Sequence, residues 1–338
     1  MMRLVTALLT TAAMVVVALS GATSSGADPT GDTSVRIGTL DHVEQIGPQR
    51  WDVFVYSPSM DEVVKLQVLR PPDTSVRQPT LYLLNGAGAG EDGANWIRQT
   101  DVEEFFADKN VNVVIPTGGE NAWWTDWESP DPVLGVNKWQ TFLTRELPPI
   151  IDAALGTTGV NAAAGMSRTG TAALQLAIAA PGVYRAVASY SGCANSSGPL
   201  GQAFVRLSMN EYGGGNAINM WGPPGDPAWA ANDPYVNAAG LRGVALYISN
   251  GSGIPGRYDN LNARGVDGQF DKLIGQVFTG GGIEAVTNYC THQLADRLNA
   301  LGIPATYNFR STGTHSWNYW RDDLHDSWPV LAGALGIE

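Results

Sequence analysis

One serine stands between an apolar run and a run of small residues, and this arrangement constrains the fold more than any other feature of the chain. The apolar run ends at Ala164, Ser167 lies within Gly165–Gly170, and the small residues of 171–180 follow. The pattern is that of a strand turning sharply into a helix, which presents a serine hydroxyl at the top of a sheet. Because serine is a poor nucleophile until a base activates it, the turn predicts a histidine, an acid and an oxyanion hole elsewhere.

Strand-like and helix-like runs alternate from residue 80 onward. Strands are expected over 81–84, 111–115, 160–164, 184–190, 244–248 and 305–309. Helices are expected over 101–108, 138–155, 171–180 and 291–301, with a break or kink at Pro148-Pro149. Three earlier strand-like runs, 35–37, 51–56 and 63–69, indicate an antiparallel edge. The expected fold class is therefore α/β, an α/β-hydrolase fold whose central sheet is mostly parallel with helices on both faces.

The first residues have the pattern of a secretory signal peptide. Arg3 precedes an apolar stretch over 4–19, and small residues mark possible cleavage after Ala22 or Ala27. The alternative, a retained anchor, is disfavoured because the stretch is short for a membrane span and lacks a basic stop signal. We expect residues 1–27 to be removed and the protein to reach the cell envelope or the medium.

The remaining residues, 28–338, are expected to form a single α/β-hydrolase catalytic domain. Of the 338 residues, 44% are hydrophobic, which is enough for one large core. Two long stretches near 192–243 and 253–282 interrupt the alternation and are rich in glycine. Long loops at the strand ends usually shape a substrate cleft, so both are expected to be cleft insertions.

Net charge and cysteine content exclude several classes of partner. A formal charge of -12 makes nucleic acid or an anionic lipid surface a poor partner. Cys290 lies near His292, but two side chains do not make a metal site, and no metal or cofactor is expected. Export permits a disulfide between Cys193 and Cys290, and the sequence leaves open whether it forms; neither cysteine is expected to be catalytic.

His315 is the expected base for Ser167. The chain has four histidines, and His315 alone follows a strand-like run directly, in the loop 310–317. A loop after the last strand is where an imidazole reaches a serine at the top of the sheet. The alternative is a histidine of a surface loop, which the serine turn disfavours.

An acid is needed to fix the tautomer of that imidazole. In α/β-hydrolases the acid follows the serine and precedes the histidine, which points to the loop after 244–248. Asp259 is the first carboxylate there and is the expected acid, which predicts a Ser-His-Asp triad. Further along the chain, Asp267, Asp271 and Glu284 are the other acidic candidates.

Two backbone amides are expected to form the oxyanion hole. One belongs to Arg168, the residue after the serine, and the other to an early loop of small residues, 85–90, in which Ala87 is the best candidate. A glycine-rich loop can instead cradle phosphate, but this one lacks the Gly-Lys-Ser/Thr ending of such loops.

Several longer strings, many with tryptophan, occur in one order along the chain. They are Leu81–Gly86, Gly118–Gly119, Trp124–Trp127, Lys138–Pro148, Gly165–Ser167, Met220–Pro223, Asp226–Trp229, Asn232–Pro234 and Gly313–Trp317. In these strings the chain resembles the secreted trehalose mycolyltransferases of mycolic-acid actinobacteria, a branch of the esterase D-like α/β-hydrolases. The similarity covers residues 81 to 320.

This resemblance implies a ping-pong acyl transfer. Ser167 would take the mycolyl group from trehalose monomycolate, and a sugar hydroxyl of trehalose monomycolate or arabinogalactan would then accept it. Asn85, Gln99 and Trp317 occupy positions that contact substrate in the family. The family has an aspartate where Asn85 stands and an asparagine where Gln99 stands.

The family acid also departs from this chain. It is typically a glutamate two residues after a proline, and that position is Arg257 here, so the role passes to Asp259 with a short insertion assumed.

Two other functions compete with mycolyl transfer. A secreted carboxylesterase would use the same triad, with water deacylating Ser167. A non-catalytic envelope-binding protein descended from such an enzyme is the alternative of a different class, and the presence of both Ser167 and His315 disfavours it.

Overall fold

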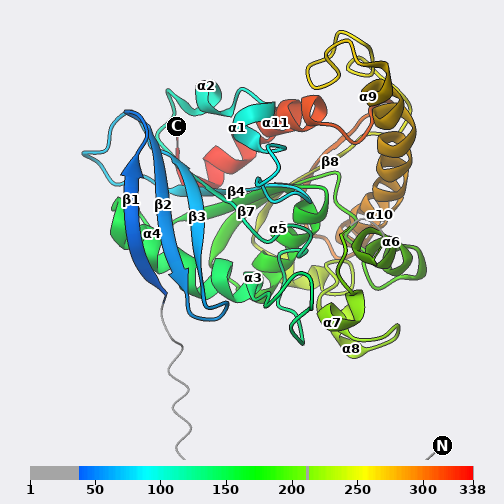
Figure 1. The fold of residues 1–338 in the computed structure, drawn as a ribbon, viewed down its shortest axis with the longest axis horizontal. Coiled ribbons are helices and arrows are strands. Elements are labelled where there is room, and N and C mark those ends of the chain that lie inside the picture. Colours follow the sequence, from blue (N-terminus) through cyan, green and yellow to red (C-terminus); the bar gives the residue numbers. More distant parts are fainter. Residues whose placement is uncertain (1–37, 211–212, 338) are drawn as a thin grey trace, which may run out of the picture. The chain divides into compact units, whose positions relative to one another are not determined.

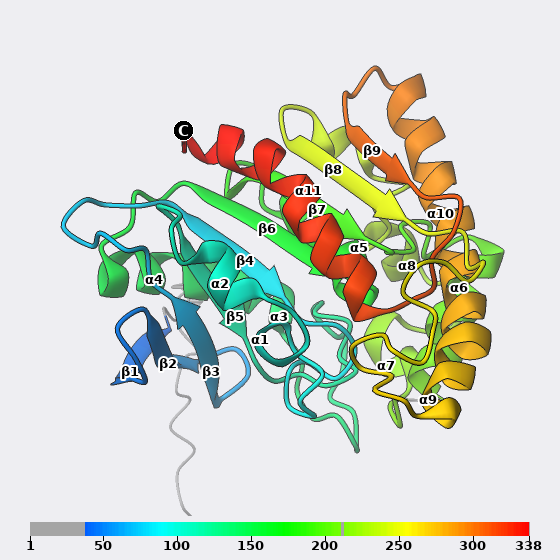
Figure 2. The same ribbon diagram turned by 90° about the horizontal axis from the view of Figure 1, so that it is seen from above.

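The computed structural model describes residues 38–210 and 213–337. Within them nine strands form one sheet in the order β1-β2-β3-β5-β4-β6-β7-β8-β9 (Figure 1 and Figure 2). The strands are β1 Thr39–Gln45, β2 Arg50–Ser57, β3 Glu62–Leu69, β4 Thr80–Leu84, β5 Asn112–Pro116, β6 Asn161–Met166, β7 Tyr184–Tyr190, β8 Ala245–Asn250 and β9 Thr306–Phe309. The signal peptide expected at 1–27 and the strand expected at 35–37 lie outside the described residues.

The sheet has an antiparallel edge and a parallel remainder. The pairs β1·β2, β2·β3 and β3·β5 are antiparallel, and the pairs from β4·β5 through β8·β9 are parallel. The order of the parallel strands places β4, β6 and β7 next to one another, so the loops at their carboxyl ends meet. The expected fold class is confirmed.

Helices connect the strands and cover both faces of the sheet. They are α1 Trp96–Gln99, α2 Val102–Phe106, α3 Trp139–Thr141, η1 Phe142–Glu146, α4 Leu147–Leu155, α5 Arg168–Ala179, α6 Pro199–Asn210, α7 Ala217–Trp221, α8 Pro227–Ala231, η2 Ala238–Leu241, α9 Phe270–Ile274, η3 Gly275–Gly280, α10 Gly281–Ala300 and α11 Trp317–Leu335. The turns η1 and η3 are π-helical and η2 is 3₁₀-helical.

Alternate residues of the central strands face two separate cores. In β4, Tyr82 and Leu84 pack in the core that α4, α5 and α10 cover, whereas Leu81 and Leu83 pack under α1, α2 and α11. Helix α11 runs across β6, β7 and β8 (Figure 2). Since both faces are buried, these strands are apolar throughout, as the sequence indicates for a parallel sheet.

Two expected helical segments differ in detail from the structure. The segment expected over 138–155 is divided into α3, η1 and α4, and it changes from a π-helical turn to an α-helix at Leu147, directly before Pro148-Pro149. The helix expected at 291–301 starts ten residues earlier, at Gly281, and continues directly from η3. This second difference matters for the position of the acid.

The expected insertion at 192–243 contains α6, α7, α8 and η2. Its aromatic and aliphatic side chains form a third hydrophobic cluster with two tryptophans of the loop after β5, Trp123 and Trp127. The expected insertion at 253–282 contains α9 and η3 and leads into α10.

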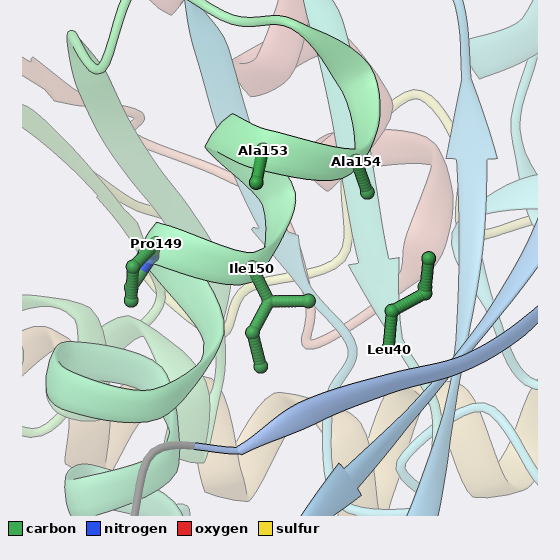
Figure 3. Close-up of a pocket in the computed structure, with 5 residues that line it drawn as sticks. All are labelled: Leu40, Pro149, Ile150, Ala153 and Ala154. Atoms are coloured by element: carbon green, nitrogen blue, oxygen red, sulfur yellow. The ribbon is translucent and has the colours of Figure 1, made fainter.

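An apolar pocket of about 400 Å³ lies between Leu40 of β1 and four residues of α4 (Figure 3). No helix of the described residues is long and apolar enough to cross a membrane.

Candidate active site

Ser167 occupies a strained turn between β6 and α5. Its φ and ψ are 56° and -128°, a conformation that costs a non-glycine residue roughly 1–3 kcal/mol. The turn is held by two backbone bonds, from Ser167 N to Tyr190 O (2.8 Å) and from Gly170 N to Ser167 O (3.1 Å). The half-buried Ser167 side chain therefore projects from the carboxyl end of β6.

Two glycines make this turn possible. A Cβ atom at Gly165 would lie 2.4 Å from the Thr169 carbonyl oxygen, and one at Gly170 would lie 3.0 Å from the Tyr190 carbonyl oxygen. Thr169 stands where such turns usually have a smaller residue, and its hydroxyl is accommodated by the Met166 backbone, accepting from its N–H (3.0 Å) and donating to its carbonyl (2.8 Å).

The structure brings His315 to Ser167. His315 lies in the loop between β9 and α11, and its Nε2 is 2.8 Å from the Ser167 Oγ. The His315 backbone N–H donates to Gly280 O (3.2 Å), and the edge of the ring meets Trp320 with centroids 4.8 Å apart. Only 9% of the His315 side chain is exposed, so the imidazole is held in a largely water-excluded position.

The carboxylate beside His315 is Glu284, and the prediction of Asp259 is wrong on this point. The Glu284 Oε2 accepts from His315 Nδ1 at 2.7 Å, and the glutamate is fully buried in the first turn of α10. Because α10 begins at Gly281 rather than near residue 291, this side chain is carried on a helix and not on the loop to which the sequence assigned it.

Three residues that the sequence did not single out hold the other Glu284 oxygen. Its Oε1 accepts from the Ser191 hydroxyl (2.8 Å), the Asn250 amide (2.8 Å) and the Gly251 N–H (2.6 Å). Ser191 follows β7, Asn250 is the last residue of β8, and Gly251 comes next. Trp320 Nε1 in turn donates to the Ser191 hydroxyl (3.0 Å). The buried charge is thus surrounded by donors, as a buried carboxylate requires.

Asp259 lies in the same region but has other partners. Its carboxylate contacts Thr314 and Tyr319, on either side of His315 in the sequence, and not the imidazole itself. The sequence therefore predicted a carboxylate in the correct region, but Asp259 contacts the neighbour of His315 and Glu284 contacts the imidazole.

Ala87 and Arg168, the expected oxyanion-hole residues, border the same narrow crevice. The Ala87 carbonyl accepts from Asn121 N (2.8 Å), which fixes the loop after β4. The Arg168 guanidinium donates to the Asn121 side chain and to Ser208 O (3.0 Å) and lies over the Trp123 ring. Burial lowers the pKa of Arg168 to about 10, so the group remains charged at neutral pH.

Of the three expected substrate contacts, Asn85 is not accessible. It is fully buried, its amide donates to Pro116 O (3.1 Å), and its carbonyl accepts from Trp96 N (3.2 Å). Both polar atoms are already used, so Asn85 fixes the loop that carries Ala87 rather than facing a ligand.

Gln99 and Trp317 do border open space. Both line a cavity of about 440 Å³ that also includes His315. Other lining residues come from the 253–282 insertion, Arg264, Gln276 and Thr279 among them. The cavity is bordered by amides, hydroxyls, a guanidinium and indole rings, a combination that suits a polyhydroxylated ligand.

A disulfide anchors the helix that carries Glu284. Cys193, just after β7, is bonded to Cys290 of α10. Beside it the Thr291 hydroxyl donates to Gly192 O (2.7 Å). The cysteine pair that the sequence left open is therefore bridged, and it attaches α10 to the central sheet.

Replacing both cysteines by serine is expected to lower the free energy of unfolding by about 2–5 kcal/mol, because the bridge closes a chain segment of 97 residues. Denaturant unfolding of the purified protein measures this change. Reduced wild-type protein should show the same loss and the reduced double variant no further loss. Equal stability of the variant and the oxidised wild type would contradict the prediction.

These contacts form a continuous chain from a serine hydroxyl through an imidazole to a buried carboxylate. Such a chain can withdraw a proton from the serine as it attacks a carbonyl carbon and return it to a leaving group. Among residues 38–210 and 213–337, no group of three or more His, Cys, Asp or Glu side chains is placed to hold a metal ion.

Comparisons with known proteins agree on one family. The Esterase family model matches residues 57–331. The diacylglycerol acyltransferase/mycolyltransferase Ag85A of Mycobacterium leprae is 35% identical over 292 residues, which cover 83% of this chain and 82% of that protein. Ag85B of Mycobacterium avium, of the same description, is 33% identical over 76% of each chain.

Solved structures show the same architecture. The Mycobacterium tuberculosis protein MPT51 (FbpC1) superimposes with a TM-score of 0.69 and 25% identity, covering 86% of this chain and all of that one. FphF, a fluorophosphonate-binding serine hydrolase of Staphylococcus aureus, has a TM-score of 0.59 and 17% identity, covering 82% of this chain and 97% of that one, and shows likeness of fold.

Proposed function

Because this chain belongs to the family of Ag85 diacylglycerol acyltransferase/mycolyltransferases, we propose that it transfers a mycolyl group from trehalose monomycolate to a sugar hydroxyl. The observation that carries the proposal is the hydrogen-bonded chain Ser167–His315–Glu284 at the carboxyl edge of the sheet. The acceptor is a second trehalose monomycolate or cell-wall arabinogalactan, and the enzyme acts outside the cell membrane.

In the first half-reaction Ser167 is the nucleophile. Its Oγ bonds to the ester carbonyl carbon while the Oγ proton passes to His315 Nε2. The tetrahedral intermediate collapses when the bond from that carbon to the trehalose oxygen breaks, and His315 returns the proton to this oxygen. Trehalose leaves, and the mycolyl group remains esterified to Ser167.

The second half-reaction runs in the opposite direction with a new alcohol. The acceptor hydroxyl gives its proton to His315 and attacks the acyl carbon, and Ser167 Oγ recovers the proton as it leaves. Throughout, Glu284 keeps the proton on His315 Nδ1 and stabilises the imidazolium. The Ala87 and Arg168 amides stabilise the oxyanion of both intermediates, a contribution worth on the order of 10²-fold or more in turnover for each donor.

The cavity beside His315 favours a sugar as acceptor. Gln99 and Trp317 border it, and its lining also includes the side chains of Gln276, Thr279 and Ser316. An alcohol bound there would compete with water at the moment when the acyl-enzyme is attacked, and this competition decides between transfer and hydrolysis.

Incubating the purified protein with a trehalose monoester tests the proposal. Transfer predicts trehalose diester and free trehalose in equal amounts, with little free acid. Free acid as the main product, even at high monoester concentration, would instead make the protein a carboxylesterase. Absence of any product together with no labelling of Ser167 by a fluorophosphonate would favour a non-catalytic envelope-binding protein.

A further inference from the structure

The Asp259 carboxylate accepts hydrogen bonds from four separate places. Its Oδ2 accepts from Gly256 N (2.6 Å) in its own loop and from the Tyr319 hydroxyl of α11 (2.7 Å). Its Oδ1 accepts from the Gln276 amide of η3 (2.7 Å) and from the Thr314 hydroxyl. A single half-buried side chain therefore connects the 253–282 insertion, the loop before α11 and α11 itself.

Two of these partners determine where His315 lies. Thr314, which is fully buried, is its neighbour in the chain. Gln276 belongs to η3, whose last residue, Gly280, accepts the His315 backbone N–H. Because η3 continues without interruption into α10, the same segment also carries Glu284.

Backbone bonds bring the Asp259 loop and the His315 loop together. Gly253 N donates to Gly313 O (2.9 Å), and Gly313 N donates to Ile254 O (2.7 Å). Gly313 has a φ of 120°, which an L-residue rarely adopts, so the loop turns sharply just before Thr314. The Asp259 carboxylate then adds the side-chain bonds that fix the loop beyond this turn.

The donors around Asp259 suit a carboxylate. Burial raises the pKa of the Tyr319 phenol and its hydrogen bond to Asp259 adds to the shift, so the phenol remains a donor. The Arg310 guanidinium covers the Tyr319 ring at 5.4 Å and pairs with Asp323, which holds α11 against the end of β9. An amide at position 259 would present N–H groups to some of these donors and lose their bonds.

We infer that Asp259 is a positioning residue, which holds the His315 loop against η3 and α10 so that the imidazole lies between Ser167 and Glu284. The inference rests on the proposed function, since its readout is the reactivity of Ser167. Asp259 touches neither Ser167 nor the imidazole, so it acts through Thr314 and Gln276.

Four variants test this role. Asp259→Asn removes the charge at nearly constant volume. Thr314→Val removes one of the four bonds in an isosteric change, and Thr314→Ser restores the hydroxyl. Asp271→Asn is the matched control, because Asp271 is an exposed aspartate of the same insertion. For each variant we would measure kcat, KM, the rate at which a fluorophosphonate labels Ser167, and Tm.

Asp259→Asn is expected to lower kcat and the labelling rate by about 10²-fold with little change in KM, since small displacements of a catalytic group have effects of this size. Thr314→Val should lower both rates by about 5- to 10-fold, the loss of one hydrogen bond, and Thr314→Ser should recover most of this loss. In Asp259→Asn the added Thr314→Val change should have no further effect, because the first change already disturbs the bond to Asp259 through which Thr314 acts.

The contrary results are equally specific. Wild-type rates in Asp259→Asn, measured well below its Tm, would overturn the inference. So would equal rates in Thr314→Ser and Thr314→Val, or a loss of the same size in Asp271→Asn. A lower Tm with unchanged rates would show a role in stability alone.

If the proposed transferase function were wrong, the experiments would give a different result from a failure of the Asp259 inference. Labelling of Ser167 requires no sugar acceptor, so a protein that releases only free acid still reports the effect of Asp259. Only an unreactive Ser167 in the wild-type protein would refute both at once, and the wild-type labelling reaction shows this before any variant is made.

Discussion

Ser167→Ala is expected to abolish labelling by a fluorophosphonate and to lower the rate of transfer from a trehalose monoester by about 10⁶-fold. The size follows from the role of the hydroxyl, because no other group in the chain of contacts can form the acyl-enzyme. The residual rate reflects the oxyanion hole and substrate binding alone. Mass spectrometry of the labelled protein and a product assay measure the two effects.

The control for this prediction is Ser75→Ala, a change of an exposed serine in the loop between β3 and β4. It should be labelled at the wild-type rate. Combining Ser167→Ala with His315→Gln should cost little more than Ser167→Ala alone, since the two side chains act as one unit. Residual labelling of Ser167→Ala, or additive losses in the double variant, would show that another nucleophile operates.

The sequence predicted the parts of the site that local patterns encode. The serine turn is recognisable because the strand, the small residues and the helix are contiguous, and the structure gives Ser167 the left-handed φ that such a turn requires. His315 was found by elimination among four histidines and by its place after the last strand. In both cases the chain near the residue specifies its position.

The acid depended on a helix boundary that the sequence does not show. Three glycines, Gly280, Gly281 and Gly282, favour a loop by propensity, yet Gly280 ends η3, and Gly281 and Gly282 begin α10 without a break in the helix. With the helix start placed at 291, Glu284 became one of several loop carboxylates. The signal that could have identified Glu284 is its position in the first turn of a helix, where acidic side chains are favoured.

Contacts between residues far apart in the sequence account for the remaining differences between the predicted and the observed site. Asn85 resembled a sugar contact, but Pro116 and Trp96, 31 and 11 residues away, take its amide and carbonyl groups. The Cys193–Cys290 bridge joins residues 97 positions apart. The local sequence predicts neither the Asn85 hydrogen bonds nor the disulfide, because these contacts depend on how β5, α1 and α10 are placed in the fold.

Glu284→Gln is expected to lower kcat by about 10⁴-fold while leaving the fold intact, and it distinguishes the roles of the two carboxylates near His315. The Gln carbonyl can occupy the place of Oε1 and accept from Ser191, Asn250 and Gly251, so the buried donors remain satisfied. The amide NH₂ then faces His315 Nδ1 and forces the ring proton onto Nε2.

In that tautomer His315 Nε2 can no longer accept the Ser167 proton, and the loss is one of chemistry rather than of binding. The measurement is kcat against KM for the monoester, with Tm as the check on folding. Asp259→Asn provides the comparison, since it leaves the tautomer unchanged and should be about 100 times more active than Glu284→Gln. If Asp259→Asn were the more damaged of the two, the charge that orients His315 would come from Asp259, and the contact between Glu284 and the imidazole would be only structural.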